Sequence, residues 1–115
     1  MEQGNLRLYL LRVLLTRDRF DKFKTQIDES VFQSGARDLY KTIGYIYRDN
    51  PNTNSINFSD LKLAYFNTYF PNHSYASQKN IHEIIDNIEN QQQPTDEVVE
   101  TAIKSMYRIK KADEL

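Results

Sequence analysis

Residues 34–48 read Ser34-Gly-Ala-Arg-Asp-Leu-Tyr-Lys-Thr-Ile-Gly-Tyr-Ile-Tyr-Arg48, and this stretch decides the fold class. Its apolar residues recur at intervals of three and four, which places them on one face of an α-helix. These residues are Leu39, Ile43, Ile46 and Tyr47. Ser34 is a residue type that caps helices, so we expect a helix over residues 35–48 with Ser34 as its N-cap. Strand patterns are nearly absent elsewhere, and the sequence therefore predicts an all-α protein.

Two further helices and a turn are expected on the N-terminal side of this segment. Apolar residues at helical spacing predict one helix over residues 3–16 and a short one over residues 17–26. The first stripe contains Leu6, Leu10, Val13 and Leu14, and the second contains Phe20, Phe23 and Ile27. Residues 28–32 predict a turn that directs Phe32 into the core.

On the C-terminal side, a polar loop at residues 49–57 precedes a helix that we expect to begin after Ser59, its N-cap, and to end before Pro71. Residues 77–89 and 95–115 predict two more helices, joined by the short turn Gln-Gln-Gln-Pro-Thr. Two helices so joined form a helical hairpin.

The expected architecture is one compact domain of about six helices that ends in this helical hairpin. We expect the globular helical core at residues 1–75 and the hairpin, with the start of a linker, at residues 76–115. The pattern of the last helix runs to Leu115 without a glycine or proline stop, so we expect the chain to be a fragment of a longer protein.

Both hairpin helices carry apolar stripes that are broad enough to cover each other and a further surface. We therefore predict that the hairpin holds neighbouring protomers together. The candidate interface residues are Ile81, Ile84, Ile85, Ile88, Val99, Ile103 and Met106.

Composition narrows the possible partners and compartments. The 115 residues carry a net charge of -1, so no overall field draws the chain to nucleic acid or to an anionic membrane. Cysteine is absent, which excludes disulfides and thiol chemistry. The longest mainly apolar stretch, residues 8–15, contains Arg12 and falls short of the roughly 20 residues of a membrane span. We expect a cytoplasmic protein that does not contact membranes.

One local motif resembles a metal-binding site. His82-Glu83-Ile84-Ile85-Asp86 resembles the zinc-protease pattern HExxH with Asp in place of the second histidine. The only other histidine, His73, lies in the preceding loop. A solvated helix surface is therefore the preferred interpretation, and an enzyme is the least favoured one. We expect no catalytic, cofactor-binding or metal-binding residues in this chain.

Basic residues crowd the first two helices and form the alternative binding site. They are Arg7, Arg12, Arg17, Arg19, Lys22 and Lys24. Beside Tyr9 and Phe20 they have the composition of a nucleic-acid surface, so the alternative function is a small helical DNA-binding regulator. Acidic neighbours at residues 18, 21, 28 and 29 favour an ordinary solvated face instead.

Five stretches follow one another in an order that resembles a known family. They are Asn5-Leu-Arg-Leu-Tyr-Leu-Leu-Arg-Val-Leu-Leu-Thr16, Arg19-Phe-Asp-Lys-Phe23, Asp28-Glu-Ser-Val-Phe32, Ala36-Arg-Asp-Leu-Tyr-Lys-Thr-Ile-Gly-Tyr-Ile-Tyr47 and Ile56-Asn-Phe-Ser-Asp-Leu61. Together they resemble the N-terminal domain of DnaB-type replicative DNA helicases. Asn57 stands where the family often has Asp, and Arg12-Val13 replaces its usual Gly-Ala. These departures indicate a divergent, phage-encoded type of member.

The resemblance implies a role in DNA replication. Such a domain forms a collar on the hexameric motor, its terminal hairpin pairs protomers, and its surface receives primase or a helicase loader. The end of the chain, Tyr107-Arg-Ile-Lys-Lys-Ala-Asp-Glu-Leu115, is similar to the start of the linker to the motor. The resemblance therefore implies oligomerisation and partner docking, no cofactor or catalysis in this fragment, and contact with DNA only through the full-length helicase.

Overall fold

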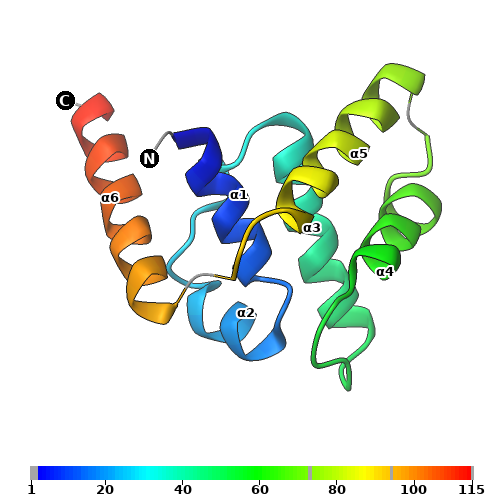
Figure 1. Cartoon of the computed structure of the whole chain (residues 1–115), viewed down its shortest axis with the longest axis horizontal. Helices are drawn as coiled ribbons and strands as arrows, with labels where there is room; N and C mark the ends of the chain where they lie inside the picture. The colour runs from blue at the N-terminus through cyan, green and yellow to red at the C-terminus, as the bar shows by residue number, and fades with distance from the viewer. Residues whose placement is uncertain (1–2, 73, 94, 115) are drawn as a thin grey trace.

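The structure is a computed structural model that describes residues 3–72, 74–93 and 95–114, with side chains for residues 6–72, 74–93 and 95–105. The described residues form six α-helices and no strand, which confirms the all-α prediction (Figure 1). The helices are α1 (Gln3–Val13), α2 (Arg17–Phe23), α3 (Ser34–Asp49), α4 (Phe58–Leu63), α5 (Tyr75–Glu89) and α6 (Asp96–Glu114). A 3-10 turn, η1 (Glu29–Val31), precedes α3, and a π-helix, η2 (Ala64–Tyr69), continues α4.

Helix α1 lies at the centre of the molecule and packs against α3, α5 and α6. Most of its circumference is apolar at its C-terminal end, because Leu10, Leu11 and Val13 are all buried there, together with Leu14 of the following turn. A helix that is apolar on most sides is surrounded by other elements. This burial explains why α1 can act as the support for both α5 and α6.

The predicted face of α3 is buried throughout, and the turn before it inserts Phe32 into the core as expected. The predicted N-cap is wrong. Gln33 occupies the cap position, and Ser34 is the first helical residue, with a φ of 51° in the left-handed region. Gly35 follows and lies directly against α5, since a Cβ atom there would stand 2.8 Å from Cδ1 of Ile81.

The N-cap of helix α4 lies two residues earlier than predicted. Asn57, not Ser59, is the N-cap, and its Oδ1 accepts a hydrogen bond of 2.7 Å from the backbone amide of Asp60. The helix then widens into η2, where the amide of Phe70 donates to the carbonyl of Tyr65, five residues back, at 2.9 Å. The segment ends before Pro71, as expected.

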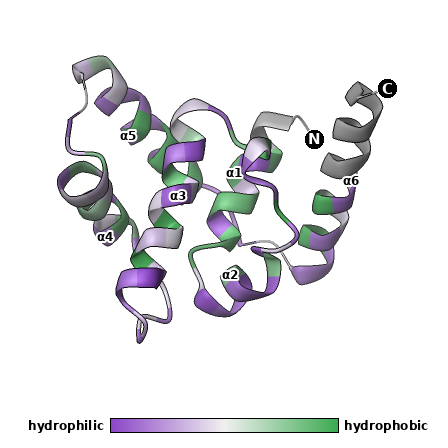
Figure 2. Cartoon of the chain, turned by 180° about the vertical axis from the view of Figure 1, so that it is seen from behind, coloured by the Kyte–Doolittle hydropathy of each residue, from purple (hydrophilic) through white to green (hydrophobic). Residues whose placement is uncertain are grey.

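The last two helices are consecutive, but they do not pair along their length as the expected hairpin would. Helix α5 packs against α1, α3 and α4, whereas α6 packs against α1. Figures 1 and 2, which view the molecule from opposite sides, both show α1 between α5 and α6. One hydrophobic cluster joins Leu11 of α1, Ile85 of α5 and Ile103 of α6, so the core is continuous across residue 75.

Candidate functional site

The predicted protomer interface is largely inside the chain. Five of its residues are buried in the chain's own core, Ile81, Ile85, Ile88, Val99 and Ile103, and Ile84 is half-buried against the same cluster. Met106 lies outside the residues whose side chains are described. Burial against α1 and its neighbours leaves the five buried side chains little free surface for a second protomer in this conformation.

A groove of about 1000 Å³ runs between α1 and the N-terminal half of α6. Its apolar lining comes from both helices and consists of Leu6, Tyr9, Leu10, Val98, Val99 and Ala102. Its polar rim includes Gln92, Gln93, Glu97, Thr101 and Lys104. Val98 is 51 % exposed although it is a large apolar side chain. Val98 and Ala102 are one helical turn apart, so the same face of α6 lines the groove along its length.

The chemistry of this groove fits a macromolecular surface better than a small polar ligand. Its walls are aliphatic, Tyr9 supplies an aromatic ring with a polar tip, and charged groups lie at the edge. Interfaces commonly combine an apolar centre, an aromatic anchor and a polar rim. An amphipathic helix is the shape that such a groove accepts.

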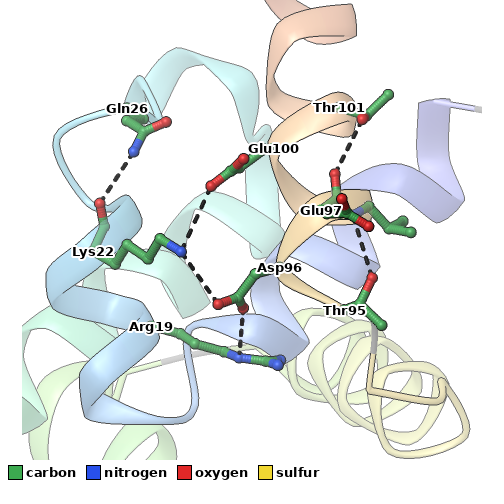
Figure 3. A network of polar contacts seen from close by, with 9 residues as sticks. Arg19, Lys22, Gln26, Thr95, Asp96, Glu97, Glu100 and Thr101 are labelled. Atoms are coloured by element: carbon green, nitrogen blue, oxygen red, sulfur yellow. Dashed lines mark hydrogen bonds and ion pairs between the residues drawn. The ribbon is translucent and has the colours of Figure 1, made fainter.

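On the other side of α6, its first two turns are bound to α2 by ion pairs (Figure 3). Nε of Arg19 lies 3.2 Å from Oδ1 of Asp96, and Nζ of Lys22 lies 3.2 Å from Oδ2 of the same carboxylate. Lys22 also reaches Oε1 of Glu100 at 3.6 Å. The hydrogen bond to Asp96 is the main cause that raises the pKa of Lys22. Acidic residues at a helix start also interact favourably with the helix dipole.

Arg17, one of the predicted DNA-binding cations, holds three backbone carbonyls within the fold. Its Nε donates to the carbonyl of Thr53 at 2.5 Å, and its Nη2 donates to those of Tyr47 and Asn50 at 3.1 and 2.9 Å. The guanidinium also stands 4.7 Å from the centre of the Tyr47 ring. These contacts close the loop after α3 against the start of α2.

The other basic residues of the first two helices are also used within the fold. Arg12 lies over the ring of Phe58, with 4.9 Å between the guanidinium carbon and the ring centre. Lys24 pairs with Asp21 at 3.4 Å. Arg7 is half-buried. Together with Arg17, Arg19 and Lys22, Arg12 thus contacts another segment of this chain, so four of the six basic residues join parts of the fold to one another.

The polar residues of the zinc-like motif, His82, Glu83 and Asp86, are exposed on α5, and His82 and Asp86 have separate contacts. The His82 ring stacks on Phe66, with 4.5 Å between ring centres, and Asp86 pairs with Lys62 of α4 at 3.6 Å. Within the described residues no group of three or more His, Asp or Glu side chains is placed to hold a metal ion. His73 lies outside the described residues.

A cluster at the C-terminal end of α3 was not predicted. The Tyr69 hydroxyl donates a hydrogen bond of 2.6 Å to Asp49, and Arg48 binds the same carboxylate through Nε at 2.9 Å and through Nη2 at 3.1 Å. These bonds, that of Arg48 foremost, lower the pKa of Asp49 to about 2. Arg48 and Asp49 are adjacent in sequence, which is a signal for their ion pair. No such signal exists for Tyr69, because the turn of η2 brings it to Asp49.

Over the part of the chain that the structure describes, no helix has both the length and the apolar character needed to cross a bilayer. Comparison with protein-family models, with curated proteins and with solved structures finds no match for this chain.

Proposed function

We propose that this chain is the N-terminal assembly and docking domain of a DnaB-type replicative helicase, acting in the cytoplasm. The observation that carries the proposal is the open, mainly apolar groove between α1 and α6, in which Val98 is half-exposed. The order of the five helicase-like stretches is the second support. The first partner is another copy of the chain, and primase or a helicase loader binds the assembled collar.

Two copies of the chain can form a symmetric dimer through this groove, because each copy carries both the groove and the exposed face of α6. In a two-fold interface each copy offers the same surface, so the exposed face of α6 in one protomer enters the groove of its partner. Each well-buried apolar side chain contributes on the order of 1.5 to 3 kcal/mol, part of which offsets the entropy lost on association. A few such residues, with Val98 and Tyr9 at the centre, support association in about the micromolar range.

Light scattering across a concentration series tests self-association, with Val98→Lys as the disrupting variant. A lysine suits an exposed helical position, so the fold should persist while a charge enters the apolar groove. We expect the wild-type chain to associate and the variant to associate at least about tenfold more weakly, which corresponds to about 1.4 kcal/mol. Leu63→Lys is the matched control, because Leu63 on α4 is also exposed, at 61 %, and lies outside the groove.

Two results would count against the proposed assembly. One is a wild-type chain that stays monomeric at the highest concentration examined. The other is a Leu63→Lys variant that associates as weakly as Val98→Lys, which would place the contact elsewhere. The helicase assignment has its own test in the complete reading frame, where a Walker A motif downstream of Leu115 supports it and a frame without an ATPase motor contradicts it.

A further inference from the structure

The two sides of α6 are held by different kinds of contact. Its apolar side places Val99 and Ile103 against α1, while its first two turns are bound to α2 by Asp96 and Glu100. The side that carries Val98 borders the open groove. Over residues 96–105, whose side chains the structure describes, α6 therefore rests on the rest of the chain through one apolar strip and one set of charges.

We propose that these charges form a salt-bridge latch, made of Arg19 and Lys22 on α2 with Asp96 and Glu100 on α6, and that α6 detaches as a unit when the latch is broken. The body that remains, α1 to α5, stays folded. The latch would operate in this way whether or not the chain is part of a helicase.

The latch is built from contacts that solvent can weaken. The side chains of Lys22, Asp96 and Glu100 are between 44 and 47 % exposed, so ions in solution screen their attraction. Arg19 is less exposed, and its partner atom, Oδ1 of Asp96, is out of contact with solvent. The pair of Arg19 and Asp96 is therefore the less screened part of the latch, and Lys22 is the part that responds most to salt.

The body, α1 to α5, is held together by contacts that do not involve α6, so it should remain folded when α6 detaches. Helix α5 is fixed by packing against three other helices, and Gly35 allows α3 to approach it closely. Arg17 fastens the loop after α3 to the start of α2 without using any part of α6. Opening would uncover Val99 and Ile103, so α6 would present a second apolar face in addition to the one that borders the groove.

Hydrogen exchange of the full chain tests the latch, with Arg19→Glu/Lys22→Glu as the disrupting variant. This change leaves the sequence of α6 intact, so its intrinsic helix propensity is unaltered. We expect the amides of α6 to exchange about tenfold faster, since several half-exposed ion pairs are lost and replaced by repulsion. The amides of α5 should change less than about twofold. Raising the salt concentration should speed exchange of α6 in the wild-type chain in the same direction.

Lys24→Glu is the matched control, because Lys24 is the C-cap of the same short helix and pairs with Asp21 rather than with α6. The rescue variant adds Asp96→Lys and Glu100→Lys to the disrupting pair, which restores attraction with the charges exchanged. Exchange should become slower than in the disrupting variant, although not fully as slow as in the wild type, because lysines at the start of α6 oppose the helix dipole. Unchanged exchange of α6 in the disrupting variant, equal acceleration in α5, or a rescue variant that stays fast would each overturn the latch.

Discussion

Helices α5 and α6 carry similar apolar stripes but are attached to the molecule in different ways. Helix α5 inserts Ile81, Ile85 and Ile88 between α1, α3 and α4. Among the residues that the structure describes, α6 has α1 as its principal packing partner, and the groove opens along its flank. The comparison shows that an apolar stripe indicates that a helix is buried on one side, while the number of helices that meet that stripe determines how firmly it is held.

Truncation of one buried isoleucine in each helix should give the largest contrast. We expect Ile85→Ala to lower the free energy of unfolding by about 3 kcal/mol, because the surrounding helices cannot close the cavity. Ile103→Ala should cost less, about 2 kcal/mol, since a site beside an open groove collapses more easily. Urea unfolding followed by circular dichroism measures both. An equal loss, with unchanged m-values, would mean that α6 is as integral to the core as α5.

Alkaline pH should destabilise the folded chain through deprotonation of Tyr65, a buried residue of η2. Burial raises the pKa of Tyr65 to about 12 from its usual 10.0, so the folded chain keeps the phenol neutral. Its contribution to stability is complete below pH 10 and is lost as the pH rises to about 12, by roughly 2 kcal/mol.

Urea midpoints between pH 9 and about 11.5 test this dependence. Tyr65→Phe should flatten the fall in stability without abolishing it, because burial also raises the pKa of Tyr47 to about 12. Tyr75→Phe is the control, since Tyr75 is 82 % exposed, and it should follow the wild-type curve. A Tyr65→Phe curve parallel to that of the wild type would contradict the expected role of burial.

The close packing of α5 on α3 can be tested at two glycines of α3, Gly35 and Gly44. Here we expect the smallest effects on stability, and the two effects should have opposite signs. A Cβ at position 35 would stand 2.8 Å from Cδ1 of Ile81 and 3.0 Å from Cδ1 of Ile84, so Gly35→Ala should cost about 1 kcal/mol. At Gly44 the nearest atom is Cζ of Phe20 at 3.9 Å, so Gly44→Ala should gain about 0.5 to 1 kcal/mol of helix propensity. Thermal melts measure both effects, and a stabilising Gly35→Ala would show that α5 is not closely packed on α3.

The sequence predicted the helices and their buried faces better than it predicted which helices pack against one another. Helical spacing correctly placed Leu39 and Ile43 in the core, and the turn before α3 correctly inserted Phe32. Spacing reports which face of a helix is apolar, but it carries no information on which helix will cover that face. For this reason the last two stripes were assigned to each other and to a second protomer, whereas the structure places α1 between the helices that bear them.

The missed features depend on backbone geometry or on distant partners. Asn57 and Ser59 are both capping residue types, and only the conformation at the start of α4 selects Asn57. The carbonyls that Arg17 binds lie 30 to 36 residues away in sequence, so no local pattern distinguishes it from a solvent-exposed cation. The groove was missed because it exists only where α6 lies beside α1.

The π-helix after α4 has a consequence for insertions and deletions. A π-helical turn holds one residue more than an α-helical turn, so its side chains fan out at narrower angles. In η2 this fan lets Phe66 stack on His82 of α5 while Tyr69 binds Asp49 of α3. Deleting one residue here would leave a regular α-helix that is intact as a helix but rotated at its end. A reading-frame-preserving loss of a single codon would thus act on this protein as a change of direction, so that η2 could no longer contact α3 and α5 together, although neither helix would be shortened.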